Sequence, residues 1–204
     1  EAALTALRRA AVLDPRSPAT QRSFGAVLHF SGRWDEAREV YERALTLAPG
    51  DISTTYSLIL VSLSEGSVSE ARRRLNTAEP AGGREALLAY VAMFGDFYWL
   101  LEAAQQDSVM RLGVKHFADD SASRAFVFAQ ILHARGDTTG ARRWARVAAR
   151  GFEAMVDLTE DSQVPALVGI SHALLGRHDE ARRWLDRASA KTANEDLESR
   201  TYIH

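Results

Sequence analysis

The sequence has no cysteine, so it can form neither a disulfide framework nor a zinc site built on cysteine. It also has no apolar run near the ~18 residues that a membrane-spanning helix needs. One of its longest runs, Ala86 to Phe94, is too short. The formal net charge of −2 is close to zero, which argues against a surface dedicated to nucleic acid or anionic lipid. We therefore expect no membrane insertion by these residues and no nucleic-acid partner.

Lysine is scarce, because only Lys115 and Lys191 among the 25 basic residues are lysine. Arginine pairs well with phosphate through its planar fork, which would suit an anion-binding function. A simpler interpretation is that arginine keeps the helices soluble. Glu70 and Arg74, for example, have the acid-before-base order at i,i+4 that stabilises a helix. We favour this second interpretation.

Signatures of catalysis are missing as well. The chain has no glycine-rich phosphate loop, no G-x-S-x-G elbow and no H-E-x-x-H zinc motif. Adjacent acids occur at Asp119–Asp120, Glu160–Asp161 and Asp179–Glu180. Each pair stands at a predicted helix start, where an acid complements the helix dipole. We therefore predict a protein that is not an enzyme and that uses no metal or cofactor.

One stretch, Gln21 to Pro49, organises the rest of the chain. It has the pattern of two short helices joined by a tight turn at residues 31–33. Its features recur 34 residues apart, with alanine at positions 3, 37 and 71, proline at 15 and 49, and glycine at 32 and 66. Ser17 and Asp51 are the predicted N-caps of the helices that follow them. A 34-residue period with helix–turn–helix content indicates a repeat array.

This stretch resembles the tetratricopeptide repeat family. It carries the family's landmarks in order: the large–small pair Phe24–Gly25, the turn glycine Gly32, then Ala37, Tyr41, Ala44 and the closing Pro49. It departs from the family at Gln21, in place of a tryptophan, and at Leu28, in place of an aromatic residue. The resemblance implies an all-α fold, a right-handed α-solenoid of antiparallel helix pairs. Gly25 and Ala37 would face each other, because only small side chains let helix axes approach to ~8–10 Å.

The same register divides the chain into units of unequal regularity. The least regular part follows the helix predicted for Arg84 to Phe94. There we expect a turn at Gly95–Asp96, a partner helix from Phe97 to Gln106, a helical turn at Ser108 to Leu112, and then a loop. The predicted units of this single array are 1–15 (second helix only), 16–49, 50–80, 81–120 (degenerate repeat plus loop), 121–158 (long second helix), 159–191 and 192–204 (start of a further repeat). Because the chain begins without methionine inside a predicted helix, we interpret it as part of a longer protein.

The resemblance implies a ligand site in the concave groove that the first helices line. The residues that the register places there are Arg22, Ala26, His29, Phe30, Tyr56, Leu60, Leu63, Phe126, Gln130 and His133. Some members of the family bind a terminal carboxylate with a clamp of lysine and asparagine. Ala26 and Leu60 stand where asparagine would be required, so we expect no such clamp here.

The implied function is an interaction scaffold that binds a protein or peptide partner in this groove. Self-association into a homo-oligomer is one alternative, and an enzyme built on an α-solenoid is another. The second half also resembles the C-terminal repeat arrays of bacterial multidomain signalling proteins, which would make this chain the docking region of a larger, cytoplasmic protein. In such an array, arginine pairs such as Arg142–Arg143 lie mostly on the outer face, where we expect solvent rather than a ligand.

Overall fold

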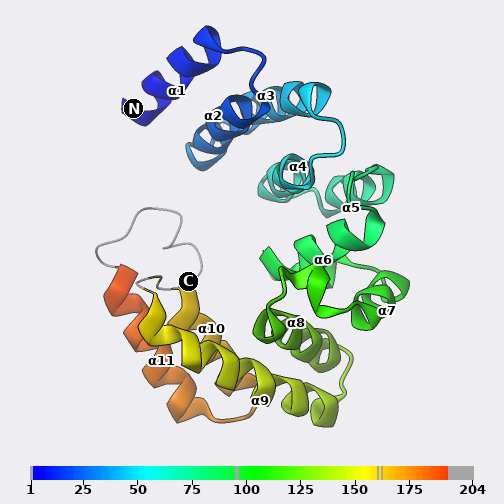
Figure 1. Ribbon diagram of the computed structural model, residues 1–204, viewed down its shortest axis with the longest axis vertical. Coiled ribbons are helices and arrows are strands. Elements are labelled where there is room, and N and C mark those ends of the chain that lie inside the picture. Colours follow the sequence, from blue (N-terminus) through cyan, green and yellow to red (C-terminus); the bar gives the residue numbers. More distant parts are fainter. Residues whose placement is uncertain (1, 95–96, 160, 162, 193–204) are drawn as a thin grey trace. The chain divides into compact units, whose positions relative to one another are not determined.

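The computed structural model describes residues 2–94, 97–159, 161 and 163–192, and over these ranges the chain is helical, without a strand (Figure 1). The protein is an α-solenoid of antiparallel helix pairs. It forms two compact units: unit 1 contains residues 1–91 and 100–105, and unit 2 contains residues 92–99 and 106–204. The two units are described separately below.

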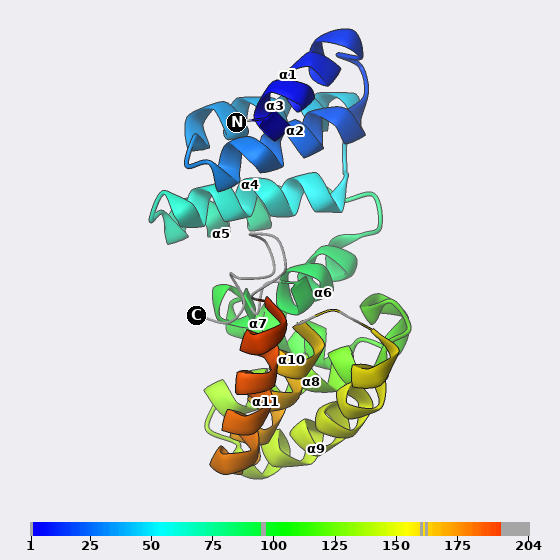
Figure 2. The ribbon, with the colours of Figure 1, turned by 90° about the vertical axis from the view of Figure 1, so that its left-hand side faces the viewer.

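Unit 1 is built from five consecutive helices. They are α1 (Ala2–Leu13), α2 (Pro18–Phe30), α3 (Trp34–Leu47), α4 (Ile52–Ser64) and α5 (Val68–Thr77). Each packs against the next, and α2 also contacts α4 (Figures 1 and 2). Three further elements, α6 (Arg84–Phe94), the 3₁₀ turn η1 (Phe97–Leu100) and α7 (Ala103–Arg111), contain residues of both units.

The helix boundaries of unit 1 follow from local chemistry. The Ser17 hydroxyl accepts a hydrogen bond from the Thr20 amide at 3.2 Å, and Asp51 accepts one from the Thr54 amide at 2.9 Å. Each bond satisfies an amide that the first helical turn leaves unpaired, so both predicted N-caps are confirmed. Gly32 has φ +74°, a conformation that glycine adopts without steric cost. It makes the tight turn between α2 and α3.

The close helix contact predicted at Gly25 is present, but its nearest neighbour is Tyr41 rather than Ala37. A Cβ atom on Gly25 would lie 2.7 Å from Cε1 of Tyr41 and 2.8 Å from its Cδ1. The Tyr41 ring is 2% exposed and belongs to the core of unit 1, together with Leu28 and Val40. The missing side chain at Gly25 therefore makes the space that the ring fills.

The segment after α6 differs from the prediction. The single helix expected from Phe97 to Gln106 is wrong, because the structure has η1 and then α7, which begins only at Ala103. The side-chain oxygen of Gln105 accepts a hydrogen bond from the Glu102 amide at 2.9 Å, as the third residue of a capping box does. This bond starts a new helix at that point.

Two further expectations for this region also need correction. The helical turn predicted at Ser108 to Leu112 is the last part of the longer helix α7. The loop expected after it contains a 3₁₀ turn, η2 (Val114–Phe117), whose Phe117 is fully buried. The turn predicted at residues 95–96 and residues 193–204 of the last predicted unit lie outside the described residues.

Unit 2 contains two antiparallel pairs. Its elements are α8 (Ser121–Ala134), α9 (Thr138–Met155), the 3₁₀ turn η3 (Val156–Leu158), α10 (Gln163–Leu174) and α11 (His178–Thr192). The helix α9 with η3 spans the long second helix that the sequence predicted. A Cβ atom on Gly169 would lie 2.9 Å from Cγ of Leu185, so the contact between α10 and α11 repeats the one made by Gly25, with leucine in place of tyrosine.

Candidate functional site

The first helices of two successive pairs, α2 and α4, are linked at both ends. Near their N-termini, Nη1 of Arg22 lies 3.2 Å from Oδ2 of Asp51. Near their C-termini, Nε2 of His29 lies 2.8 Å from the hydroxyl oxygen of Ser64. These two contacts hold the helices side by side in parallel. We use the name first-helix surface for the predicted groove residues of these two helices, which are Arg22, Ala26, His29, Phe30, Tyr56, Leu60 and Leu63.

Arg22 is a charged group of this surface with donors still available to a ligand. Its partner Asp51 also accepts hydrogen bonds from the amide and the hydroxyl of Thr54. Burial acts to raise the pKa of Asp51, but the bonds from Thr54 and the guanidinium of Arg22 together hold this pKa below its usual value. Within the described ranges, Asp51 is the hydrogen-bond partner of Arg22, through Nη1 alone. The side chain is 41% exposed, so Nε and Nη2 can donate to a ligand oxygen.

An aromatic pair forms the other end of the first-helix surface. The ring centroids of His29 and Phe30 are 5.6 Å apart at an interplanar angle of 24°. Burial lowers the pKa of His29 below its ordinary value of 6.5, so the imidazole is neutral at pH 7. Phe30 is 45% exposed. This end therefore offers an uncharged surface on which an apolar or aromatic side chain could pack.

Tyr90 of α6 extends the surface and was not among the predicted residues. Its ring meets that of Tyr56 edge to face, with centroids 5.3 Å apart, and its hydroxyl lies 3.5 Å from the hydroxyl oxygen of Ser53. The repeat period could have found it, because positions 56 and 90 are 34 residues apart. Between the two ends, Ala26 and Leu60 are half-buried and carry no polar group.

The three predicted groove residues of unit 2 are not equivalent to those of unit 1. Phe126 is 3% exposed, packs edge to face on Phe152 at 5.8 Å, and belongs to the unit 2 core. Gln130 is 6% exposed, whereas His133 is exposed. Contrary to the sequence-based hypothesis, the structure leaves Phe126 and Gln130 little surface to offer a ligand, because the core of unit 2 covers that side of α8.

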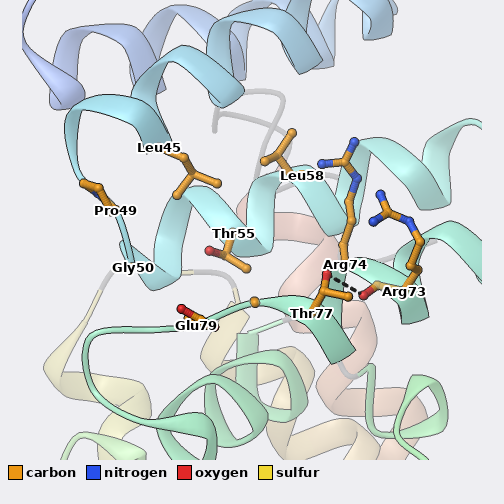
Figure 3. Close-up of a pocket in the computed structure, with 10 residues that line it drawn as sticks. Leu45, Pro49, Gly50, Thr55, Leu58, Arg73, Arg74, Thr77 and Glu79 are labelled. Atoms are coloured by element: carbon orange, nitrogen blue, oxygen red, sulfur yellow. Dashed lines mark hydrogen bonds between the residues drawn. The ribbon is translucent and has the colours of Figure 1, made fainter.

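A pocket of about 410 Å³ lies elsewhere in unit 1 (Figure 3). Residues of α3, α4 and α5 line it with the segment after α5, and no residue of the first-helix surface is among them. Two arginines stand at its edge, but both are engaged: Arg73 and Arg74 pair with Glu70 at 2.5 and 2.9 Å, and Arg74 also pairs with Glu42 at 3.2 Å. Arg74 therefore links α5 to α3, Arg73 is paired within α5, and neither presents an unpaired charge to a ligand.

The family model for the tetratricopeptide repeat matches residues 19–43, 128–146 and 169–187. These three segments of the chain match the tetratricopeptide repeat. The first matched range covers most of α2 and α3, the second joins α8 to α9, and the third joins α10 to α11. No curated protein sequence matches the chain.

Solved structures of tetratricopeptide repeat proteins share the fold. TTC0263, a thermophilic member from Thermus thermophilus, is 21% identical, with a TM-score of 0.54, over 92% of this chain and 97% of that one. PilW, a type IV pilus biogenesis factor, is 12% identical, with a TM-score of 0.54, over 98% of this chain and 89% of that one. At these identities the likeness concerns the fold, and this fold serves in general as a scaffold for protein–protein interaction.

Proposed function

We propose that this repeat array binds an extended peptide or protein segment on the first-helix surface of unit 1. The observation that carries the proposal is that Arg22 is only partly paired. Its Nη1 is anchored on Asp51, while the rest of the guanidinium is exposed beside an otherwise uncharged surface. An extended segment has unpaired main-chain carbonyl groups, and these are acceptors that Arg22 can reach with its remaining donors.

The rest of the first-helix surface fits the side chains of such a segment. Phe30 and the half-buried Tyr56 offer aromatic area at the two ends of the strip, and Ala26 with Leu60 keeps the middle apolar. The position of Asn in the family's carboxylate clamp is occupied by Ala26 and Leu60. The ligand is therefore an internal segment with apolar side chains, bound by burial and main-chain hydrogen bonds, without chemical conversion.

The proposal is tested by selecting ligands from a displayed peptide library with the wild-type chain and measuring each selected peptide by fluorescence anisotropy. The test variant is Arg22→Glu with Tyr56→Ala, and we expect it to weaken binding at least tenfold. The control is Arg43→Glu, since Arg43 is exposed on the second helix α3. Circular dichroism melting checks that both variants fold. Equal affinity of the wild type and the test variant for every selected peptide would contradict the proposal.

Self-association is a second candidate, favoured by one observation. Val12 and Leu13 at the end of α1 are 74% and 76% exposed, and exposed neighbouring apolar side chains can serve as a contact between two copies. Light scattering of the chain at several concentrations tests this, with Val12→Ser/Leu13→Ser as the variant. A strictly monomeric chain at all concentrations excludes this function.

A further inference from the structure

A stripe of arginines runs along the exposed face of α9 in unit 2. We use the name arginine stripe for Arg142, Arg143, Arg146 and Arg150, all of which are exposed. At 100° per residue these four side chains fall within one 100° arc of the helix, opposite the buried residues Ala148 and Phe152. Arg142 and Arg150 are about 12 Å apart along the axis, since each residue rises about 1.5 Å.

The arginine stripe differs from the arginine pair of α5 in having no acidic partner among the described residues. On α5, Arg73 and Arg74 both pair with Glu70. For none of the four stripe residues is there an ion pair or a hydrogen bond to any residue that the structure describes; the only interaction of the set is the Arg143 guanidinium 5.4 Å from the ring centroid of Trp144. The acid within α9, Glu153, lies 2.8 Å from Nε2 of the buried His172. The helix thus carries four exposed positive charges that no described acid neutralises.

The neighbouring turn adds to this charge. A Cβ atom on Gly176 would lie 3.6 Å from Nη2 of Arg142, so Arg142 reaches the turn between α10 and α11. The next residue, Arg177, is exposed. The acids nearest in sequence to these residues are Asp137, which caps α9 through the Gly140 amide at 2.8 Å, and Asp179 and Glu180 in the first turn of α11. Glu180 lies 3.9 Å from Nη2 of Arg183. The two acids of α11 offset part of the charge that the turn adds.

We propose that the arginine stripe is a docking surface for an acidic peptide segment of a partner protein. The spacing supports an extended acidic segment: Arg142, Arg146 and Arg150 succeed one another at about 6 Å along the helix axis, and alternate residues of an extended chain are about 6.6 Å apart. Carboxylates at every second residue can therefore meet successive guanidinium forks, which pair with carboxylates in two-pronged geometry.

Other polyanions fit this surface less well. Single-stranded nucleic acid is held by aromatic side chains on which bases stack, and the only aromatic residue near the stripe on α9, Trp144, is half-buried, with the Arg124 guanidinium 5.4 Å from its ring centroid. An anionic membrane surface is normally bound with apolar side chains beside the basic ones. Here the exposed apolar residue nearest in sequence, Val147, is 45% exposed and falls outside the arc of the four arginines, about 40° beyond Arg143 at 100° per residue. The chemistry of the arginine stripe favours carboxylates.

The test uses the full chain and a fluorescein-labelled octapeptide of alternating glutamate and serine, with a glutamine–serine octapeptide as the neutral comparison. Fluorescence anisotropy at low salt measures the affinity. We expect the glutamate peptide to bind at least tenfold more tightly than the neutral one, with an affinity that falls as salt is added. The variant Arg142→Gln/Arg146→Gln/Arg150→Gln should lower this affinity at least tenfold.

A control of equal charge separates the arginine stripe from the net charge of the protein. The variant Arg9→Gln/Arg16→Gln/Arg43→Gln removes three exposed arginines of unit 1 and should change the affinity less than twofold. Equal effects of the two triple variants would overturn the proposal. The proposal would also be overturned if an oligothymidylate of four charges, or phosphatidylserine vesicles, bound more tightly than the glutamate peptide and did so through the same three arginines. The first-helix surface is intact in the stripe variant, so failure of this proposal leaves the proposed function untouched.

Discussion

Replacing Gly25 by leucine tests the helix contact on which unit 1 is built. A Cβ atom at this position would lie 2.7 Å from Cε1 of Tyr41, whereas ordinary contacts begin at 3.4 Å. The ring would have to move by about 0.7 Å even for an alanine, by the difference of these two distances. Tyr41 is 2% exposed, so it cannot move toward solvent without separating α2 from α3.

Two opposing contributions set the magnitude. Removing a glycine from a helix interior stabilises the folded state by about 0.5–1 kcal/mol, because the unfolded chain loses freedom. Overpacking a filled core costs about 1–3 kcal/mol, and more when the added side chain is large. For Gly25→Leu we expect the second contribution to exceed the first by about 1–2 kcal/mol, which for a chain of this length lowers the melting temperature by roughly 2–4 °C per kcal/mol.

The assay is urea unfolding followed by circular dichroism, together with hydrogen exchange of the α2 and α3 amides, because destabilisation of one repeat is felt first by its neighbours. Ser23→Leu is the matched control, since it adds the same side chain on the exposed side of α2 and should change stability by less than about 0.5 kcal/mol. Combining Gly25→Leu with Tyr41→Ala should recover at least about 1 kcal/mol as coupling energy. Unchanged stability of Gly25→Leu, or zero coupling, would refute the contact.

Two other predictions follow from described contacts. Burial lowers the pKa of His29 below 6.5, so the unfolded state binds the proton more readily than the folded state. The stability that neutral His29 contributes should be present above pH 6.5 and lost as the pH falls through the lowered pKa. Urea titrations of His29→Gln should lack this part of the pH dependence. Arg124 lies 4.5 Å from the Phe128 ring centroid and 5.4 Å from that of Trp144, and its Nε donates to the carbonyl of Leu112 at 2.9 Å. Since lysine has no planar fork, Arg124→Lys should destabilise unit 2 by about 1–2 kcal/mol and change the fluorescence of Trp144. An unaltered emission spectrum of the variant would contradict the contact between Arg124 and Trp144.

Much of the regular part of the fold is readable from short-range patterns. Asp51 and Ser17 cap their helices within three residues of themselves, and Gly32 makes its turn through its own φ angle. The resemblance of Gln21 to Pro49 to one known repeat extended this reading to α8–α9 and α10–α11. The structure of residues 97–117 could not be predicted in this way. The helix α7 begins where the Gln105 side chain accepts a hydrogen bond from the Glu102 amide, and a periodic apolar pattern does not indicate such a bond.

Outside residues 97–117, the sequence by itself determined which helices form and how each pairs with its neighbour, because capping, turning and the alternation of small and large residues act over a few positions. The tertiary structure alone decided which side chains remain accessible. Phe126 and Tyr56 both occupy predicted groove positions, yet Phe126 lies in a core shared with α9 and α10 while Tyr56 stays half-buried beside Tyr90. Likewise, Arg73 and Arg74 on α5 resemble Arg142 and Arg143 on α9 in the sequence. Only the structure shows that the first two pair with Glu70 and that the second two have no ion pair with a described residue. Accessibility and pairing depend on residues far apart in the chain, which a local pattern does not contain.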